Sequence, residues 1–347
     1  GARNCLIDLQ RLCSYGHFRL SQNMGQTREL LAGLGESHSA FVTSLMLQRA
    51  GVNARFIDLS GWCDEGDLTL EERITGAMKG VDLETEMPIV TGYAQCSEGL
   101  MGEFDRGYSE VTFSQIAAQS KAREAIIHKE FHLSSADPNL VGQDAVRKLG
   151  RTNYDVADQL SNMGMEAIHP NAAKILRRAG ITLRVTNAFE PGDPGTLIDD
   201  QPADNSAVEI VTGLDIIALE VFEQDMVGVK GYDAAILEVL KRHDVRIVSK
   251  VSNANTITHY LDSSLKIMKR VEKDIAALYP SAEISSRTLS LASVIGRDLS
   301  GLAVLQTGLT GEAHDRAYAV IDGLDGRAVF VELGAAGEVE EVKRGAI

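Results

Sequence analysis

The segment N-A-A-K-I-L-R-R-A-G-I-T-L-R-V-T, residues 171–186, decides the fold. Residues 171–179 have the composition of a helix, and Gly180 can adopt the left-handed backbone that ends one. The six residues that follow, 181–186, alternate apolar and polar side chains and are rich in β-branched residues, as is typical of a strand. A helix joined to a strand through a single glycine is the connection that α/β domains repeat.

The same alternation extends toward the N-terminus. Apolar spacing predicts helices over 3–20, 26–50, 109–120 and 153–163, and strands over 54–59, 87–93 and 124–129. Gly33 and Gly35 are expected to interrupt the second helix, and Ser109 is expected to be the N-cap of the third. The first 200 residues are therefore predicted to form an α/β domain with a largely parallel sheet.

The rhythm changes after a linker rich in Pro, Asp and Gly at about 190–206. Beyond it we predict strands over 208–211, 216–222, 244–250, 254–260 and 282–295, and helices over 231–242 and 264–278. Two β-α-β units in tandem favour a small ferredoxin-like module, with a domain boundary near residue 205. In the tail from Thr310, 29 of the last 38 residues are Gly, Ala, Val, Asp, Glu or Arg. It is either a surface hairpin and helix or the product of a shifted reading frame.

Composition excludes several classes of protein. The 347 residues carry 49 acidic against 34 basic side chains, a net charge of -15 that repels phosphate backbones, so no nucleic-acid partner is expected. No apolar run approaches the length of a membrane span. The four cysteines form no C-x-x-C pair, which favours a reducing, cytoplasmic compartment. They are Cys5, Cys13, Cys63 and Cys96.

Generic catalytic motifs are absent from the sequence. There is no P-loop pattern and no G-x-S-x-G elbow. His128 and His132 are four residues apart, but on a strand-to-loop segment they do not share a face. No protein metal site is therefore predicted.

The informative segment is F-D-R-G-Y-S-E-V-T, residues 104–112. It opens a predicted helix, whose free N-terminal amides favour an anion, and Arg106 offers a planar fork to a carboxylate. A capped helix with a solvated arginine accounts for the same residues, and on these residues alone both interpretations stay open.

Five segments, taken in order, resemble the aspartate kinases. R-G-Y-S-E-V-T resembles that family's R-G-G-S-D-x-T, and G-E-S-H-S resembles its G-E-x-x-S. The other three are S-S-A-D-P at 134–138, G-M-E-A-I-H-P at 164–170, and N-A-F at 187–189 with P-G-T-L-I at 194–198. The resemblance implies a partial amino-acid kinase domain over 1–200, an ACT-like regulatory domain over 207–290, and an incomplete or altered second ACT-like domain over 291–347.

The resemblance also implies a reaction, in which ATP with Mg²⁺ phosphorylates the side-chain carboxylate of L-aspartate. Arg106 would hold the substrate's α-carboxylate, Glu36 its ammonium group, and Ser109 would complete the catalytic set. The implied substrate-binding residues further include Gly107, Tyr108 and Glu110. The implied nucleotide-binding residues are Lys129, Ser135, Asp137, Pro138, Glu166 and Ala167.

The sequence departs from the family's pattern at several positions. Tyr108 replaces a glycine, Glu110 an aspartate, and Glu166 a nucleotide-contacting lysine that Lys129 is suggested to replace. Together with I-H-K-E-F-H at 127–132, these changes resemble the branch of aspartate kinases associated with ectoine synthesis. The family's phosphate-binding K-[FI]-G-G-T-S is not in the sequence. We therefore expect an N-terminally truncated chain that is inactive as given.

Two alternatives to an aspartate kinase stay open. One is a non-catalytic regulatory subunit of such an enzyme, although 200 residues of kinase domain exceed what that role needs. The other is a different amino-acid kinase, acting on glutamate or a nucleotide, which the ACT-like tail disfavours. The implied partners are L-aspartate, ATP, an amino-acid effector at the ACT-like domain, and further copies of the chain through that domain.

Overall fold

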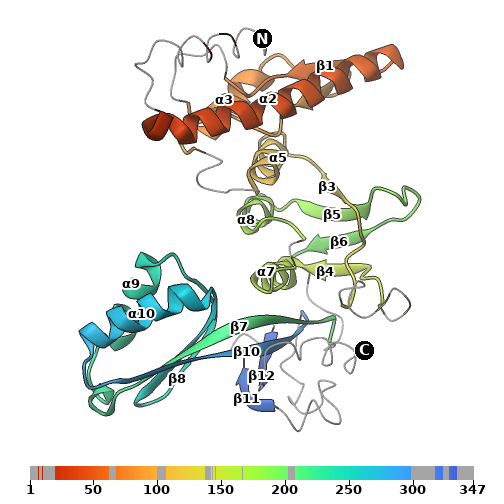
Figure 1. The fold of residues 1–347 in the computed structure, drawn as a ribbon. Coiled ribbons are helices and arrows are strands. Elements are labelled where there is room, and N and C mark those ends of the chain that lie inside the picture. The colour runs from red at the N-terminus through yellow and green to blue at the C-terminus, as the bar shows by residue number, and fades with distance from the viewer. Residues whose placement is uncertain are drawn as a thin grey trace. The chain divides into compact units, whose positions relative to one another are not determined.

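The computed structural model describes residues 20–61, 68–99, 107–136, 146–165, 167–201, 208–297, 317–322 and 328–333, and the single residues Ile7, Gln10, Gly142 and Asp144. The chain divides into two compact units (Figure 1). Unit 1 comprises residues 1–125 and 168–183, and unit 2 comprises residues 126–167 and 184–347. Each unit is described by itself.

Unit 1 is built from helices and one small sheet. Its elements are α2 (Leu20–Arg49), β1 (Ala54–Ile57), α3 (Leu70–Met78), β2 (Met87–Val90), α5 (Tyr108–Gln119) and α8 (Pro170–Arg178). Strands β1 and β2 pair in parallel, and α5 packs on α8. The predicted elements 26–50, 54–59, 87–93, 109–120 and 171–179 are confirmed with small shifts of their ends. The predicted helix 3–20 lies almost wholly outside the described residues.

Two details of unit 1 differ from the sequence predictions. The expected break at Gly33 and Gly35 is wrong, because α2 runs through both. A helix tolerates single glycines when its flanking turns remain bonded, at a cost of about 1 kcal/mol each relative to alanine. Helix α3 was not predicted, although Thr69 and Glu72 form a capping box at its start.

Unit 2 contains a four-stranded sheet in the order β3-β5-β6-β4. Its members are β3 (Glu124–Lys129), β4 (Arg151–Asn153), β5 (Thr182–Asn187) and β6 (Thr196–Asp199), and α7 (Tyr154–Asn162) follows β4 directly. The first two residues of β3 and of β5 fall in unit 1. Strands β4 and β6 are parallel and had not been predicted, since three or four residues are too few to show periodicity. Among the described residues the sheet is separate from β1-β2.

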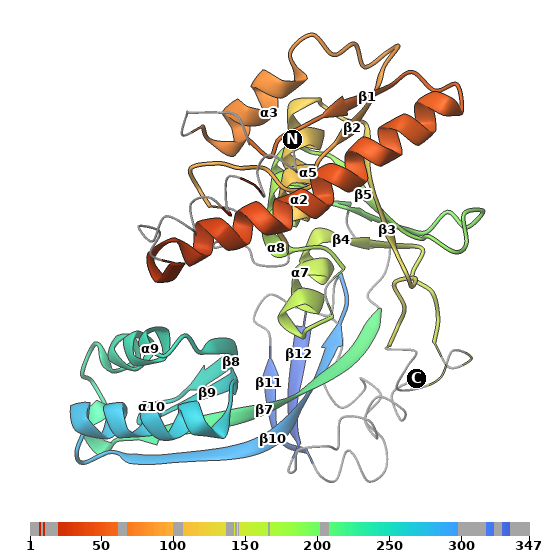
Figure 2. The same ribbon diagram turned by 45° about the horizontal axis from the view of Figure 1, so that its top comes forward.

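Residues 210–295 of unit 2 form a βαββαβ module. It consists of β7 (Ile210–Phe222), a 3-10 turn η3 (Gln224–Met226), α9 (Tyr232–Arg242), β8 (Arg246–Ser252), β9 (Thr256–Asp262), α10 (Leu265–Leu278) and β10 (Glu283–Ile295). The strands lie antiparallel in the order β10-β7-β9-β8 (Figure 2). This is the predicted ferredoxin-like arrangement. The two strands expected over 208–222 are one, because residues 212–215 also pair with β10.

The two faces of this module bury different side chains, since alternate residues of a strand point to opposite sides. From β7, Ile217, Leu219 and Val221 pack under α9 and α10. Ile216 and Ala218 belong to a second core on the other face. That core also includes residues of α7, namely Val156 and Leu160 in the helix, with Met163 just beyond its end.

Beyond β10, the described part of the tail is an antiparallel pair. Strands β11 (Ala317–Asp322) and β12 (Ala328–Leu333) pair with each other, and β12 adds to the edge of β10. This pair fits the hairpin of the first of the two interpretations of the tail, and the rest of the tail lies outside the described residues. The predicted domain boundaries near 205 and 290 stay predictions. None of the described helices has the length and apolarity needed to cross a membrane.

Candidate active site

Glu36 lies on α2 and carries an unequal pair of carboxylate oxygens. Its Oε1 accepts two hydrogen bonds, from the Tyr108 hydroxyl at 2.8 Å and from Ser109 Oγ at 2.9 Å. Its Oε2 is buried and has no hydrogen-bond partner among the described residues. A buried carboxylate oxygen without a donor is unfavourable, so this atom is suited to receive an N–H group from a ligand.

Gly92 follows β2 and forms the surface against which Oε2 lies. A Cβ at this position would come within 2.5 Å of Glu36 Oε2 and 3.0 Å of Ser109 Oγ. Any side chain here would therefore displace the carboxylate. Only glycine allows Glu36 and Ser109 to approach the backbone this closely, and the Gly92 backbone therefore lines the site beside Oε2.

Tyr108, which donates to Glu36, packs against a second tyrosine. The rings of Tyr93 and Tyr108 meet edge to face, with centroids 6.1 Å apart and an interplanar angle of 81°. The Tyr93 hydroxyl donates to Glu29 Oε2 at 3.3 Å, and the Tyr93 ring lies where a side chain on Gly33 would be. Burial, with the bond to Glu36 next, raises the pKa of Tyr108 to about 12, so the phenol remains a donor.

The start of α5 differs from the prediction. Ser109 is not the N-cap, because Gly107 holds that position and no side chain caps the helix. The Ser109 hydroxyl instead donates to the Glu36 carboxylate. A hydrogen bond to a carboxylate is stronger than the bond between a capping hydroxyl and a backbone N–H. Ser109 thus lies in the first turn of α5 and joins the site through its side chain.

Gly107 and Glu110 connect α5 to α8. A Cβ on Gly107 would lie 2.0 Å from the ring of His169, so only glycine allows this approach. Glu110 accepts a hydrogen bond from the backbone N–H of His169 at 2.5 Å, at the N-terminus of α8. Glu110 therefore faces α8 rather than Glu36, and its predicted contact with substrate stays a prediction. Arg106 lies outside the described residues.

The predicted nucleotide-binding residues belong to unit 2 where they are described. Lys129 ends β3 half-buried, and its carbonyl accepts from the Ala188 N–H. Ser135 contacts two segments, since its Oγ accepts from the Arg147 N–H and its carbonyl from the Val211 N–H. Ala167 is buried and can offer only backbone. Asp137, Pro138 and Glu166 lie outside the described residues.

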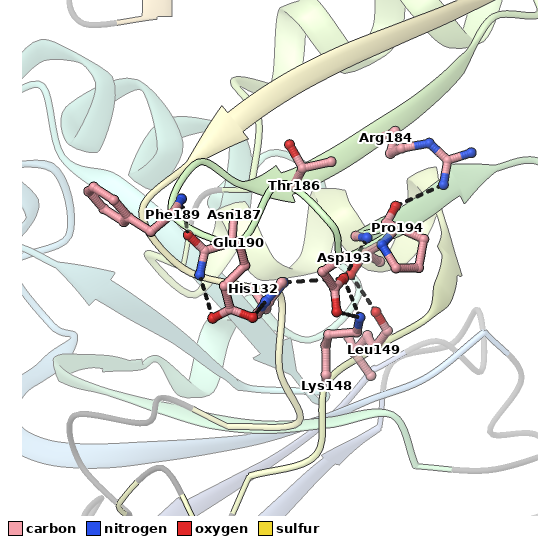
Figure 3. Close-up of polar contacts among 12 residues, drawn as sticks. His132, Lys148, Leu149, Arg184, Thr186, Asn187, Phe189, Glu190, Asp193 and Pro194 are labelled. Atoms are coloured by element: carbon pink, nitrogen blue, oxygen red, sulfur yellow. Dashed lines mark hydrogen bonds and ion pairs between the residues drawn. The ribbon is translucent and has the colours of Figure 1, made fainter.

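A polar network lies beyond β3 and β5 (Figure 3). His132 Nε2 is 3.1 Å from Glu190 Oε2, and its Nδ1 is 3.9 Å from Asp193 Oδ1, so the three residues could in principle hold a cation. Lys148 Nζ, however, contacts both Asp193 oxygens at 2.5 and 2.6 Å. This bond holds the pKa of Asp193 below its usual value. Since an ammonium already occupies Asp193, the network is better explained as an ion-paired loop than as a metal site.

Of the predicted site residues, the structure brings Glu36, Tyr108 and Ser109 into contact, with Gly107 adjacent. Sequence reasoning missed Gly92, Tyr93 and Glu29. A T-G-Y sequence directly after an apolar strand was the available signal for the first two, since glycine at a strand's end often marks a close approach. Glu29 had no such signal, because its contact depends on the distance between two elements.

The amino acid kinase family profile matches residues 10–187. The chain belongs to the amino acid kinase family. A second profile, of a family described only as a protein of unknown function (DUF3363), matches residues 266–347.

Within the amino acid kinase family, the similarities are to aspartate kinases. Aspartate kinase Ask_Ect of Stutzerimonas stutzeri is 55% identical over 306 residues, which cover 88% of this chain and 64% of that protein. An aspartokinase of Schizosaccharomyces pombe is 30% identical over 52% of this chain and 36% of its own length. The chain thus spans less than two thirds of these relatives.

Solved structures agree on the fold. Escherichia coli aspartokinase III in complex with aspartate and ADP matches with a TM-score of 0.74 at 16% identity, over 99% of this chain and 80% of that one. The aspartate kinase of Clostridium acetobutylicum matches with a TM-score of 0.71 at 18% identity, over 89% and 73%. The expected fold class, a kinase-type α/β domain followed by a ferredoxin-like, ACT-type module, is confirmed.

Proposed function

We propose that this chain is the larger part of an aspartate kinase, which transfers the γ-phosphoryl group of ATP to the β-carboxylate of L-aspartate and gives 4-phospho-L-aspartate. The observation that carries the proposal is the unpaired oxygen of Glu36, in a segment that resembles the family's ammonium-binding motif. In this proposal the reaction is the first step of aspartate-family amino-acid synthesis. The proposal extends to ectoine synthesis, for which the similarity to aspartate kinase Ask_Ect is the support.

The proposed reaction depends on the positioning of aspartate and ATP more than on acid–base catalysis. The β-carboxylate of aspartate has a pKa near ~3.9, so at neutral pH it is already a nucleophile and needs no general base. The difficulty is that two anions must meet, and bound Mg²⁺ supplies charge neutralisation on the ATP phosphates. In this proposal Glu36 holds the ammonium group and orients the substrate, while Arg106 holds its α-carboxylate.

In this proposal the ATP-binding residues are Lys129, Ser135, Asp137, Pro138, Glu166 and Ala167. Among the described ones, Lys129 fits a phosphate, because it is a cation at the end of β3. Ser135 fits less well, since its hydroxyl and carbonyl already accept backbone hydrogen bonds. The proposal extends to an amino-acid effector and self-association at the ferredoxin-like module, and to a cytoplasmic location.

The test measures ATP-dependent release of ADP with each acceptor, and hydroxylamine traps the acyl phosphate that a carboxylate acceptor forms as its hydroxamate. The protein tested should be the chain with a phosphate-binding segment of the family's K-[FI]-G-G-T-S type added ahead of residue 1, and L-aspartate, L-glutamate and UMP should be offered as acceptors. We expect hydroxamate from L-aspartate alone, lowered about a hundredfold or more by Glu36→Gln. Phosphorylation of glutamate or UMP instead would show a different amino-acid kinase. No transfer to any acceptor would favour a regulatory subunit.

A further inference from the structure

The two oxygens of Glu36 are treated differently by the protein. Both hydrogen bonds reach Oε1, from Tyr108 at 2.8 Å and Ser109 at 2.9 Å, while Oε2 is buried against Gly92 without a partner. Two donors converging on one oxygen fix the plane of a carboxylate, whereas a single donor leaves it free to turn. The direction of Oε2 therefore depends on both hydroxyls.

The Tyr108 hydroxyl is itself held in place. Its ring meets Tyr93 edge to face, and Tyr93 is fixed at its other end by the bond to Glu29. A side chain on Gly33 would overlap the Tyr93 ring at 2.4 Å, so that ring lies directly against α2. Tyr108 thus reaches Glu36 from a rigid aromatic pair, which is how a protein supports a group that must not move.

We infer that Tyr108 is a positioning residue that makes the site selective for ligands with an α-ammonium group, by holding Glu36 so that Oε2 meets that group. The inference rests on the proposed function, in which Glu36 binds the ammonium of an amino acid. It deepens that proposal, because the motif this segment resembles has glycine at this position, which carries no hydroxyl. Tyr108 would therefore give this chain a selectivity for α-ammonium ligands through a hydroxyl that the family's motif does not contain.

The experiment compares two ligands that differ in the ammonium group. L-Aspartate and succinate share both carboxylates, and succinate lacks the ammonium, so the ratio of their affinities reports the Glu36 contact alone. Isothermal titration with residues 1–347 should give tighter binding of aspartate. In Tyr108→Phe the aspartate affinity should fall about tenfold, as for loss of a hydrogen bond to a charged group, and the succinate affinity should stay within about twofold.

The matched control is Tyr232→Phe, which removes a phenolic hydroxyl from α9 of the ferredoxin-like module, where the ring stacks on Tyr279 and makes no contact with Glu36. It should leave the aspartate-to-succinate ratio unchanged. Ser109→Ala removes the other donor to Oε1 and should lower the ratio as Tyr108→Phe does. The second variant keeps the inference testable if Tyr108→Phe does not fold.

Three results would overturn the inference. An unchanged ratio in Tyr108→Phe and Ser109→Ala would show that the hydroxyls do not direct Oε2. Equal losses for aspartate and succinate would show a structural role only. In both cases the proposed function stands. If the parent chain binds succinate as tightly as aspartate, the ammonium contact of Glu36 fails, and the inference fails with it.

Discussion

A carboxylate is suited to bind a cationic ligand when one of its oxygens accepts hydrogen bonds from the protein and the other accepts none. Glu36 meets this description, since Tyr108 and Ser109 both donate to Oε1 while Oε2 is buried and unpaired. An amino-acid substrate also carries an α-carboxylate, which needs a cation of its own. Arg106 lies two residues before Tyr108 in sequence and is the residue that we expect to supply it.

At Arg106, substitutions in the chain extended with the phosphate-binding segment distinguish a planar guanidinium from a single ammonium as the partner of the substrate's α-carboxylate. Arg106→Ala should lower kcat/KM for aspartate by the equivalent of about 2–5 kcal/mol, because a charged partner is left unpaired. Arg106→Lys should recover only part of the loss, since an ammonium cannot bind a carboxylate through two parallel N–H groups. A value for Arg106→Ala within about threefold of the parent would exclude Arg106 as the anchor.

At the scale of elements, the N-terminus of α5 is positioned by its contact with α8. Glu110 receives the His169 N–H, and Gly107 lets the imidazole of His169 lie against the backbone just before Tyr108 and Ser109. The two hydroxyls that hold Glu36 are thus placed by a helix–helix contact rather than by a flexible loop.

Gly107→Ala tests this contact. The added Cβ would overlap His169 at 2.0 Å, and overpacking of this kind typically destabilises by about 1–3 kcal/mol. We expect a lower Tm and weaker aspartate binding. Gly35→Ala is the control, because it adds the same methyl group where nothing lies within 4 Å and α2 gains helix propensity. Equal Tm values for the two variants would contradict the account.

A second element, β9, buries a histidine in the ferredoxin-like module. His259 is fully buried, its Nε2 is 3.5 Å from Asp233 Oδ1, and Lys250 pairs with the same aspartate. Burial, only partly offset by Asp233, lowers the pKa of His259 from 6.5 to about 4. Because the folded pKa is depressed, the contribution of His259 to stability is complete above pH 6.5 and is lost as the pH falls toward 4.

Urea unfolding followed across that window measures the effect. The free energy of unfolding should fall with a slope approaching about 1.4 kcal/mol per pH unit from this residue, and His259→Leu should remove that part of the slope. His128→Gln, on β3, should retain it, since His259 is still present. An unaltered slope in His259→Leu would show that the histidine does not titrate in this way.

Long elements could be predicted from the sequence, whereas very short strands and contacts between distant segments could not. The βαββαβ module was predictable because each strand and helix carries its own period, and so were α5 and α8. Strands β4 and β6 were missed because three or four residues show no period, and the Gly33–Gly35 break was wrong because neighbouring turns hold α2 together. Glu36 and Ser109 were recognisable from a motif, but the Tyr93–Tyr108 pair and Gly92 depend on distances that no local pattern encodes.

At the scale of the whole molecule, unit 2 joins the strand β4 to the ferredoxin-like module through one buried carboxylate. Glu209 precedes β7 and accepts from Thr152 Oγ1 at 2.8 Å. Its other oxygen accepts from the backbone N–H and the Nε of Arg297, at 3.0 and 2.7 Å. The charge is therefore paired and fully hydrogen-bonded, the condition under which a buried ion pair is tolerated.

Glu209→Gln should destabilise unit 2 by about 3–5 kcal/mol, because it leaves the Arg297 guanidinium without its counter-ion. The control is Asp199→Asn, which breaks a pair with the largely exposed Arg151 and should change stability by less than about 1 kcal/mol. Chemical denaturation of both variants measures the difference. Similar losses for the two would mean that the Glu209 network is not the stronger junction.

The central claim, that Glu36 receives the ammonium group of aspartate, is tested most directly by a crystal structure of residues 1–347 with L-aspartate bound. The account predicts the ligand nitrogen within about 3 Å of Glu36 Oε2, with the hydroxyls of Tyr108 and Ser109 still on Oε1. A structure in which aspartate binds elsewhere, or in which its nitrogen contacts another group while Oε2 stays unpaired, would contradict it.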